Sequence, residues 1–114
     1  MRDKALWWLG LSRDDIRAFP EDARRLAGFQ LRRVQQGLEP NDWRPMPTIG
    51  PGVEEIRIHT TREHRVVYIA KFAEAVYVVH AFEKRSRKTP KRDLDLARQR
   101  LQQFLRQRRN RGWT

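Results

Sequence analysis

The sequence contains no cysteine among its 114 residues. Disulfide bonds, thiolate zinc sites and a cysteine nucleophile are therefore excluded. No run of about eighteen or more apolar residues is present, so the sequence offers no transmembrane span. The charged start 1–4 and the short apolar stretch 5–11 do not fit a secretory signal. We expect a cytoplasmic protein without a membrane anchor.

Residues that serve metal, nucleotide or serine chemistry are equally scarce. The three histidines, His59, His64 and His80, lack the i, i+4 spacing of a helical zinc pair. Glycine-rich patterns that cradle a nucleotide are absent. The only serines, Ser12 and Ser86, stand at an expected helix start and in a cationic loop. We therefore expect no metal site, no cofactor and no nucleophilic triad.

Positive charge, in contrast, is abundant and unevenly distributed. Lysine and arginine number 25 against 14 acidic residues, which gives a net charge of +11, a pI of about 11.3 and a mean hydropathy of −0.87. Residues 1–50 hold nine basic and seven acidic residues, whereas residues 51–114 hold sixteen and seven. The densest run, 83–92, has six cations and one anion. This asymmetry indicates a binding face for phosphates of a polyanion.

The first half of the chain predicts one strand and two helices. The apolar run 5–10 ends at a glycine, as a first or edge strand does. Ser12 with Asp15 resembles a capping box at the start of a brief helix that Pro20 stops. Pro20 then opens a second helix at its first position, and apolar residues recur at helical spacing until Gly37.

The second half predicts a loop, three strands and a last helix. Prolines and glycines crowd 39–52, which indicates a loop, with Trp43 and Met46 turned to the core. Three β-rich segments with short connections predict an antiparallel meander over 53–60, 65–72 and 75–82. Thr89 and Pro90 match the N-cap and first position of a helix whose apolar stripe runs from Leu94 to Leu105.

Together these elements predict a small α+β fold. An antiparallel sheet of about four strands would carry two N-terminal helices and one C-terminal helix. The length fits one domain spanning residues 1–114, with a basic tail, 106–114, that is expected to fray.

Cations of the meander are the candidates for chemistry. Arg57 and His59 share a strand face, and Arg65, Lys71, His80 and Lys84 lie on or just after the next two strands. Cleavage of RNA needs a base for the 2′-OH, cations for the phosphorane and an acid for the 5′-oxygen. Two of these candidates also have a structural alternative: Arg57 could pair with Glu55 or Glu63, and His80 could be a satisfied core histidine.

Three segments carry a family resemblance: 53–58 (VEEIRI), 64–68 (HRVVY) and 80–90 (HAFEKRSRKTP). They resemble toxins of type II toxin–antitoxin systems, in the RelE/ParE superfamily and closest to its HigB-like, phage-related branch. In that branch a stretch of the form H-A-F-x-K-K-x-x-K-T-P precedes the last helix, and this chain has Arg85 in place of the second lysine.

The resemblance implies a compact α+β fold, cleavage of messenger RNA on the translating ribosome and neutralisation by an antitoxin encoded beside the toxin, of the helix-turn-helix kind. It implies that Arg57 and Arg65 contact the scissile phosphate, and that Lys84, Arg85 and Arg87 belong to the family's basic stretch after the last strand. The phosphate-binding candidates are Lys71, Arg85, Arg87, Lys88, Lys91 and Arg92. Relatives place a catalytic tyrosine or histidine near the C-terminus, where this chain has Gly112-Trp113-Thr114. The base and acid therefore stay open among His59, His80 and Lys84.

Two other functions remain in competition with RNA cleavage. The gyrase-poisoning branch of the same superfamily inhibits without cleaving RNA, and the C-terminal departure favours such an inhibitor. A basic RNA-binding protein without toxicity would show salt-sensitive binding and no cleavage.

Overall fold

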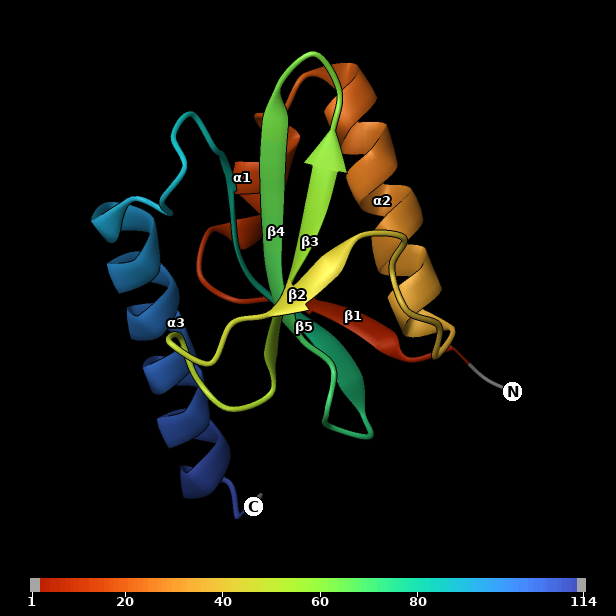
Figure 1. Ribbon diagram of the computed structural model, residues 1–114. Helices are drawn as coiled ribbons and strands as arrows, with labels where there is room; N and C mark the ends of the chain where they lie inside the picture. The colour runs from red at the N-terminus through yellow and green to blue at the C-terminus, as the bar shows by residue number, and fades with distance from the viewer. Residues whose placement is uncertain (1–2, 113–114) are drawn as a thin grey trace.

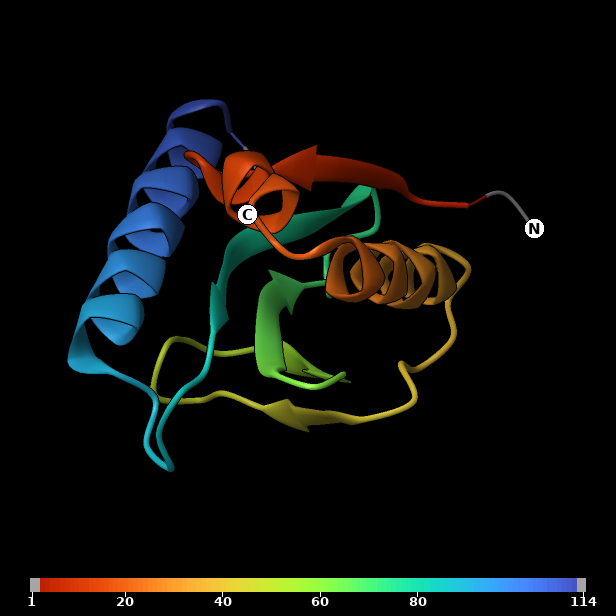
Figure 2. The same cartoon turned by 90° about the horizontal axis from the view of Figure 1, so that it is seen from above.

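The computed structural model describes residues 3–112. Its elements in chain order are β1 (Ala5–Trp8), α1 (Ser12–Arg17), α2 (Glu21–Gln35), β2 (Trp43–Pro45), β3 (Val53–His59), β4 (Glu63–Ile69), β5 (Ala75–Glu83) and α3 (Lys91–Asn110). The strands form one sheet, with α1 and α2 packed on one face and α3 on the other (Figures 1 and 2). The predicted α+β class, its two N-terminal helices and its C-terminal helix are confirmed.

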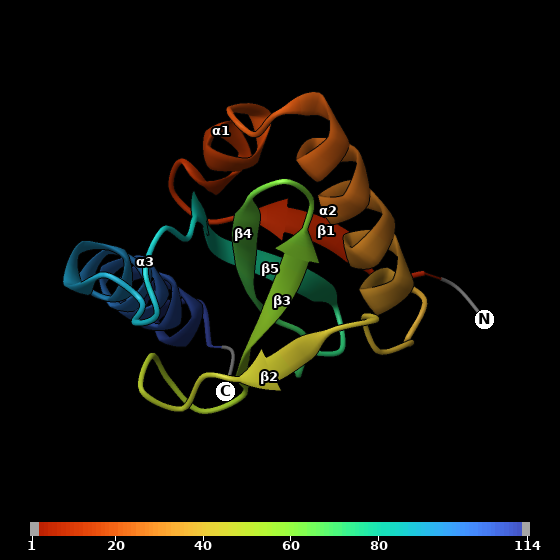
Figure 3. The same cartoon turned by 45° about the horizontal axis from the view of Figure 1, so that its top comes forward.

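The sheet has the strand order β1-β5-β4-β3-β2. The meander β3–β4–β5 is antiparallel, as the short connections predicted. β1 instead pairs parallel with β5, so the sheet is mixed and has five strands rather than about four antiparallel ones. The sequence of the short run 5–10 could not indicate this parallel pairing, because the partner strand is distant in the chain. β1 and β2 lie at opposite edges of a strongly twisted sheet (Figure 3).

The prediction that 39–52 holds no regular element is wrong. β2 pairs antiparallel with β3, with Trp43 opposite Ile56 and Pro45 opposite Glu54. β2 is an edge strand, and an edge strand tolerates proline because its outward N–H needs no strand partner. Met46 is buried, as expected, and its N–H donates to the Val53 carbonyl at 2.8 Å.

One core lies between the sheet and the N-terminal helices. Its buried side chains include Ala23, Ala27, Leu31 and Val34 of α2, which confirms the predicted apolar stripe. The stripe is incomplete, because Leu26 within α2 and Leu38 beyond its end are exposed.

The second core lies between the sheet and α3. Ala97 and Leu101 of α3 are buried against Val53, Val67 and Val79. Leu94, Phe104 and Leu105 pack beside them, as the helical spacing predicted. α3 packs on this face alone, so its two ends lie beside two different parts of the molecular surface (Figure 1).

Both predicted helix caps are wrong. Ser12 is the first residue of α1, and its hydroxyl donates to the Val78 carbonyl at 3.0 Å, which ties α1 to the sheet. Thr89 precedes the cap residue Pro90, and its buried hydroxyl has no hydrogen-bond partner within residues 3–112. Pro20 and Pro90 are themselves the N-caps, one residue before the position predicted for each.

No helix within residues 3–112 is long and apolar enough to cross a bilayer. α3 continues through the first half of the tail expected to fray and ends at Asn110. The last two residues of that tail, 113–114, lie outside the described part of the chain.

Candidate nucleic-acid interface

Four cations lie on the α3 face of the sheet, near the N-terminal end of β4. Arg57 on β3 stands directly opposite Arg65 on β4, and Arg44 on β2 stands opposite Glu55 on β3. Lys84 follows β5, and the charges of Arg44, Arg57 and Arg65 all act on it. We call Arg44, Arg57, Arg65 and Lys84 the cationic site. Like charges opposed across a ladder destabilise a sheet unless anions intervene, so this arrangement calls for a negative partner.

Glu55 provides part of that negative charge from inside the protein. Its side chain is 0% exposed, and Oε1 accepts a hydrogen bond from Arg44 Nε at 3.1 Å. The same oxygen lies 3.7 Å from Arg65 Nε, whereas Oε2 has no partner within the described residues. One buried carboxylate thus holds two guanidinium groups in place but leaves the four cations with an excess of positive charge.

Arg65 underlies this site rather than projecting from it. Its side chain is 8% exposed, and Nη1 donates to Glu63 Oε1 and to the His64 carbonyl, both at 3.0 Å. The anionic partner expected for a charged residue on a central strand is therefore found within the chain. The buried positive charge of Arg65 acts on the site from within the protein, where the low dielectric strengthens its electrostatic effect.

Lys84 releases its proton more easily than an ordinary lysine does. Burial, followed by the charges of Arg65 and Arg44, lowers the pKa of the Lys84 ammonium below its usual 10.5. Its backbone N–H donates to the Glu63 carbonyl at 2.7 Å, which fixes the start of the basic loop beside β4. A lysine with a lowered pKa next to guanidinium groups suits a proton donor.

A groove of about 480 Å³ extends from the cationic site towards the start of α3. Arg44 forms one side, and Arg87, Lys88 and Thr89 of the basic loop form the other. Apolar side chains complete it, from Pro45, Met46, Pro47 and Leu94. A lining that combines cations with apolar side chains fits a nucleotide, which presents a phosphate and a flat base.

His59 lies at the border of the cationic site, half exposed. Its Nε2 is 2.6 Å from Asp42 and its Nδ1 is 2.8 Å from Glu63, and Asp42 also lies 3.9 Å from Arg57. Hydrogen bonds to Asp42 and then Glu63 raise the pKa of the His59 imidazole. The ring therefore favours its cationic form, which adds positive charge to the site and leaves less of the neutral ring to accept a proton.

The structure does not bring His80 to the cationic site. His80 is buried, with Nε2 2.8 Å from Asp93 of α3 and Nδ1 3.2 Å from Asp15 of α1. Arg100 Nη1 bonds to the same Asp15 at 2.8 Å, so this network joins β5 to both helices. A bulge in β5, where Val67 pairs with His80 but Tyr68 pairs with Val78, turns His80 to the α3 face.

The expected phosphate-binding residues fall into two regions. Arg87 and Lys88 line the groove, and Arg85 pairs with Glu83 beside it. Lys91 at the start of α3 pairs with Asp95 at 3.0 Å, and Arg92 is exposed next to it. Lys71 instead follows the far end of β4, over the Phe72 ring, so the structure separates it from the other candidates.

Sequence reasoning did not find Arg44 and Glu55 as parts of this site. Arg44 stands between prolines in a segment predicted as a loop, so nothing marked it as facing Glu55. Alternation in β3 did place Glu55 on the face of Arg57. An acidic residue on a predicted inward face next to two arginines is the signal that would have marked it.

Comparison with known proteins supports a toxin-like identity. No curated protein matches the chain. The family described as "Phage derived protein Gp49-like (DUF891)" matches residues 14–102, which span α1 to the middle of α3 and contain the whole cationic site. The chain therefore belongs to the phage-derived Gp49-like (DUF891) family, a RelE/toxin-like family.

Proposed function

We propose that this protein is the toxin of a type II toxin–antitoxin module and cleaves messenger RNA on the ribosome without a metal ion. The observation that carries the proposal is the cationic site, in which one buried carboxylate pairs with only two of four cations, beside a groove of about 480 Å³. Membership of a toxin-like family supports the same conclusion.

The geometry suits transfer of a phosphoryl group to the 2′-oxygen of the RNA itself. The 2′-hydroxyl gives its proton to solvent water as its oxygen attacks phosphorus, the bond to the 5′-oxygen breaks, and a 2′,3′-cyclic phosphate remains. Arg44 and Arg57 stabilise the charge of the phosphorane, with Arg65 adding its field from beneath. Lys84 gives a proton to the departing 5′-oxygen, which its lowered pKa makes easier. The neighbouring hydroxyl is held next to phosphorus, so no metal-bound nucleophile is needed.

The partners follow from the charge of the site and from the family. We propose a cytoplasmic toxin whose antitoxin, a helix-turn-helix protein encoded beside it, neutralises it until the toxin is released. Electrostatic complementarity favours an acidic antitoxin surface opposite a chain of net charge +11. Ribosome-bound mRNA offers the same negative charge as substrate.

The test is induction of the gene alone, together with cleavage of ribosome-bound mRNA by purified protein that has been stripped of metals with EDTA and then freed of the chelator. The wild-type protein should stop growth and shorten transcripts. Lys84→Ala should lower the cleavage rate about 10²- to 10³-fold, because both charge and proton are lost. Lys84→Arg should keep RNA binding yet cleave poorly, because a guanidinium does not release its proton at neutral pH.

Arg24→Ala is the matched control, because Arg24 is an exposed cation of α2, which packs on the other face of the sheet. It should leave growth arrest and cleavage unchanged. The wild-type rate should fall as pH rises through the lowered pKa of Lys84, and this fall should vanish in Lys84→Arg. Normal growth with intact transcripts contradicts the proposal, and DNA-damage signalling with intact mRNA would assign the chain to the gyrase-poisoning type.

A further inference from the structure

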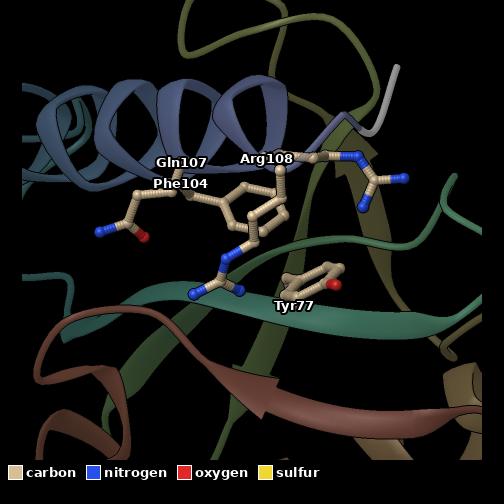
Figure 4. A pocket seen from close by; sticks show the side chains of 5 residues that line it. Tyr77, Phe104, Gln107 and Arg108 are labelled. Carbon is tan, nitrogen blue, oxygen red and sulfur yellow. The ribbon is translucent and has the colours of Figure 1, made fainter.

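A second groove, of about 540 Å³, lies far from the cationic site. It runs between β1 and the last turns of α3 and is lined by Trp7, Leu9, Tyr77, Phe104, Gln107 and Arg111, among others. We call it the β1–α3 groove. Figure 4 shows the ring of Phe104 on α3 facing Tyr77 on β5, with β1 running beside them. The cationic site instead lies towards β2 and the start of α3.

The wall of this groove is held rigidly. The rings of Tyr77 and Phe104 lie 4.3 Å apart between centroids, and the Tyr77 hydroxyl donates to Glu74 at 2.7 Å. Arg108 pairs with the same Glu74, and its guanidinium lies 3.7 Å from the centre of the Phe72 ring. These contacts form the apolar wall before anything binds, which lowers the entropic cost of binding.

The other side of the groove is a sheet edge without a partner. β1 pairs only with β5, so its outer edge is open within the described structure. Trp7 is 57% exposed and lies on the face of β1 that looks into the groove. The strand, Ala-Leu-Trp-Trp, contains none of the lysines or prolines that usually protect an edge, whereas the opposite edge strand β2 ends in Pro45.

Charge determines what kind of segment fits. Residues 96–112 contain six arginines and no acidic residue. Arg111 lines the groove, and it makes no ion pair with any residue in the range 3–112. A ligand with apolar side chains and carboxylates matches this rim, whereas a second copy of the chain would bring +11 against +11.

We propose that the β1–α3 groove binds an extended, acidic segment of a partner protein, which adds a strand to the free edge of β1. Its apolar side chains cover Trp7, Tyr77 and Phe104, and its carboxylates reach Arg111. Strand addition supplies backbone hydrogen bonds, and the aromatic wall selects alternate side chains. The proposal concerns a separate surface and does not depend on RNA cleavage.

The test uses the full chain and a synthetic peptide of ten residues that alternates valine with glutamate. Titration calorimetry should give a dissociation constant on the order of 10–100 μM, as a short preformed site allows. Hydrogen exchange should slow in residues 5–9. Trp7→Ser and Phe104→Ala should each weaken binding about tenfold or more. Arg111→Glu should weaken it about fivefold or more.

Two control peptides and one control variant distinguish specific binding at this site from non-specific binding. A peptide N-methylated at alternate residues cannot pair with a strand edge, and a lysine version reverses the charge, so both should fail to bind. Leu26→Ser removes an exposed apolar side chain of α2 and should bind as the wild type does. Absence of binding up to about 1 mM, equal binding of either control peptide, protection at β2 or RNA binding in the groove overturns the proposal. Dimerisation of the free chain that Trp7→Ser abolishes assigns the edge to a second copy and overturns it too.

Discussion

Glu74 illustrates how one side chain joins two elements that the sequence does not connect. It lies just before β5 and accepts hydrogen bonds from Tyr77 Oη and from Arg108 of α3. Burial raises the pKa of Glu74, but the bonds from Arg108 and Tyr77 outweigh it and lower the pKa to about 2. The charged form of Glu74 is therefore favoured by folding, and it fastens the C-terminal half of α3 to the sheet.

This predicts a pH-dependent effect of Glu74→Gln. A carboxylate whose folded pKa lies below its unfolded value stabilises the fold above about pH 4.5, and this contribution is lost as pH falls towards 2. We expect the substitution to lower the free energy of unfolding by about 1.5 kcal/mol at pH 7, because one charged hydrogen-bonded pair is lost. Urea unfolding should show the gap between the two proteins narrowing between pH 6 and pH 3.

Glu21→Gln provides the comparison for that experiment. Glu21 pairs with Arg25 on an exposed turn of α2, where ion pairs contribute little. The free energy of unfolding should change by less than about 0.5 kcal/mol at either pH. A gap of constant size for Glu74→Gln across the whole range would contradict the assigned role of the charged pair.

At the scale of elements, periodicity determined what could be predicted. α2, α3 and the meander β3–β5 bury one face or both, so their spacing and composition marked them in the sequence. β2 could not be predicted from the sequence. Its proline is compatible with a strand only because β2 lies at the edge of the sheet, and the sequence does not show that position. β1 pairs with β5, a strand that lies about seventy residues later in the chain, so no residue in or near β1 indicates a parallel pairing.

The candidate site divides in the same way. Arg57 and Arg65 were predictable as facing cations, because alternation and a short hairpin determine their register. The contact between Arg44 and Glu55 was not predictable, because it depends on strand β2, which the sequence did not predict. The turn of His80 to the α3 face was not predictable, because a bulge cannot be located from alternation alone.

The start of α3 offers a test of a failed helix cap. Thr89 has the composition of an N-cap, yet its buried hydroxyl bonds to nothing within residues 3–112. Thr89→Val keeps the shape and removes the unsatisfied group, so the free energy of unfolding should rise by about 0.5–1 kcal/mol. A capping threonine would instead lose about 1 kcal/mol, so thermal unfolding distinguishes the two by the sign of the change.

Ser12→Ala is the counterpart in which a hydroxyl is satisfied. Ser12 is buried and donates to the Val78 carbonyl, so its removal leaves a buried acceptor of the sheet without that bond. The free energy of unfolding should fall by about 1 kcal/mol or more. Equal losses for both variants would show that Thr89 also has a partner.

At the scale of the whole molecule, the charge of +11 is divided among different surfaces. The cationic site and its groove lie at the β2 edge and the start of α3. Arg111, which follows the last residue of α3, lies in the groove beside β1, at the other end of that helix. The molecule thus presents one cationic surface suited to phosphates and a second, partly apolar surface suited to a protein segment.

This division predicts that the salt dependence of RNA binding follows position rather than net charge. For single-stranded RNA the logarithm of the binding constant falls with the logarithm of salt by about 0.7 for each phosphate neutralised. Arg87→Ala and Lys88→Ala each remove an exposed cation that lines the groove, so each should reduce that slope by about 0.7. Arg24→Ala removes the same charge from α2 and should leave the slope unchanged. The measurement is fluorescence anisotropy of a labelled, uncleavable 2′-O-methyl RNA from about 50 to 300 mM salt, and equal slopes for all three variants would mean that the net charge acts diffusely.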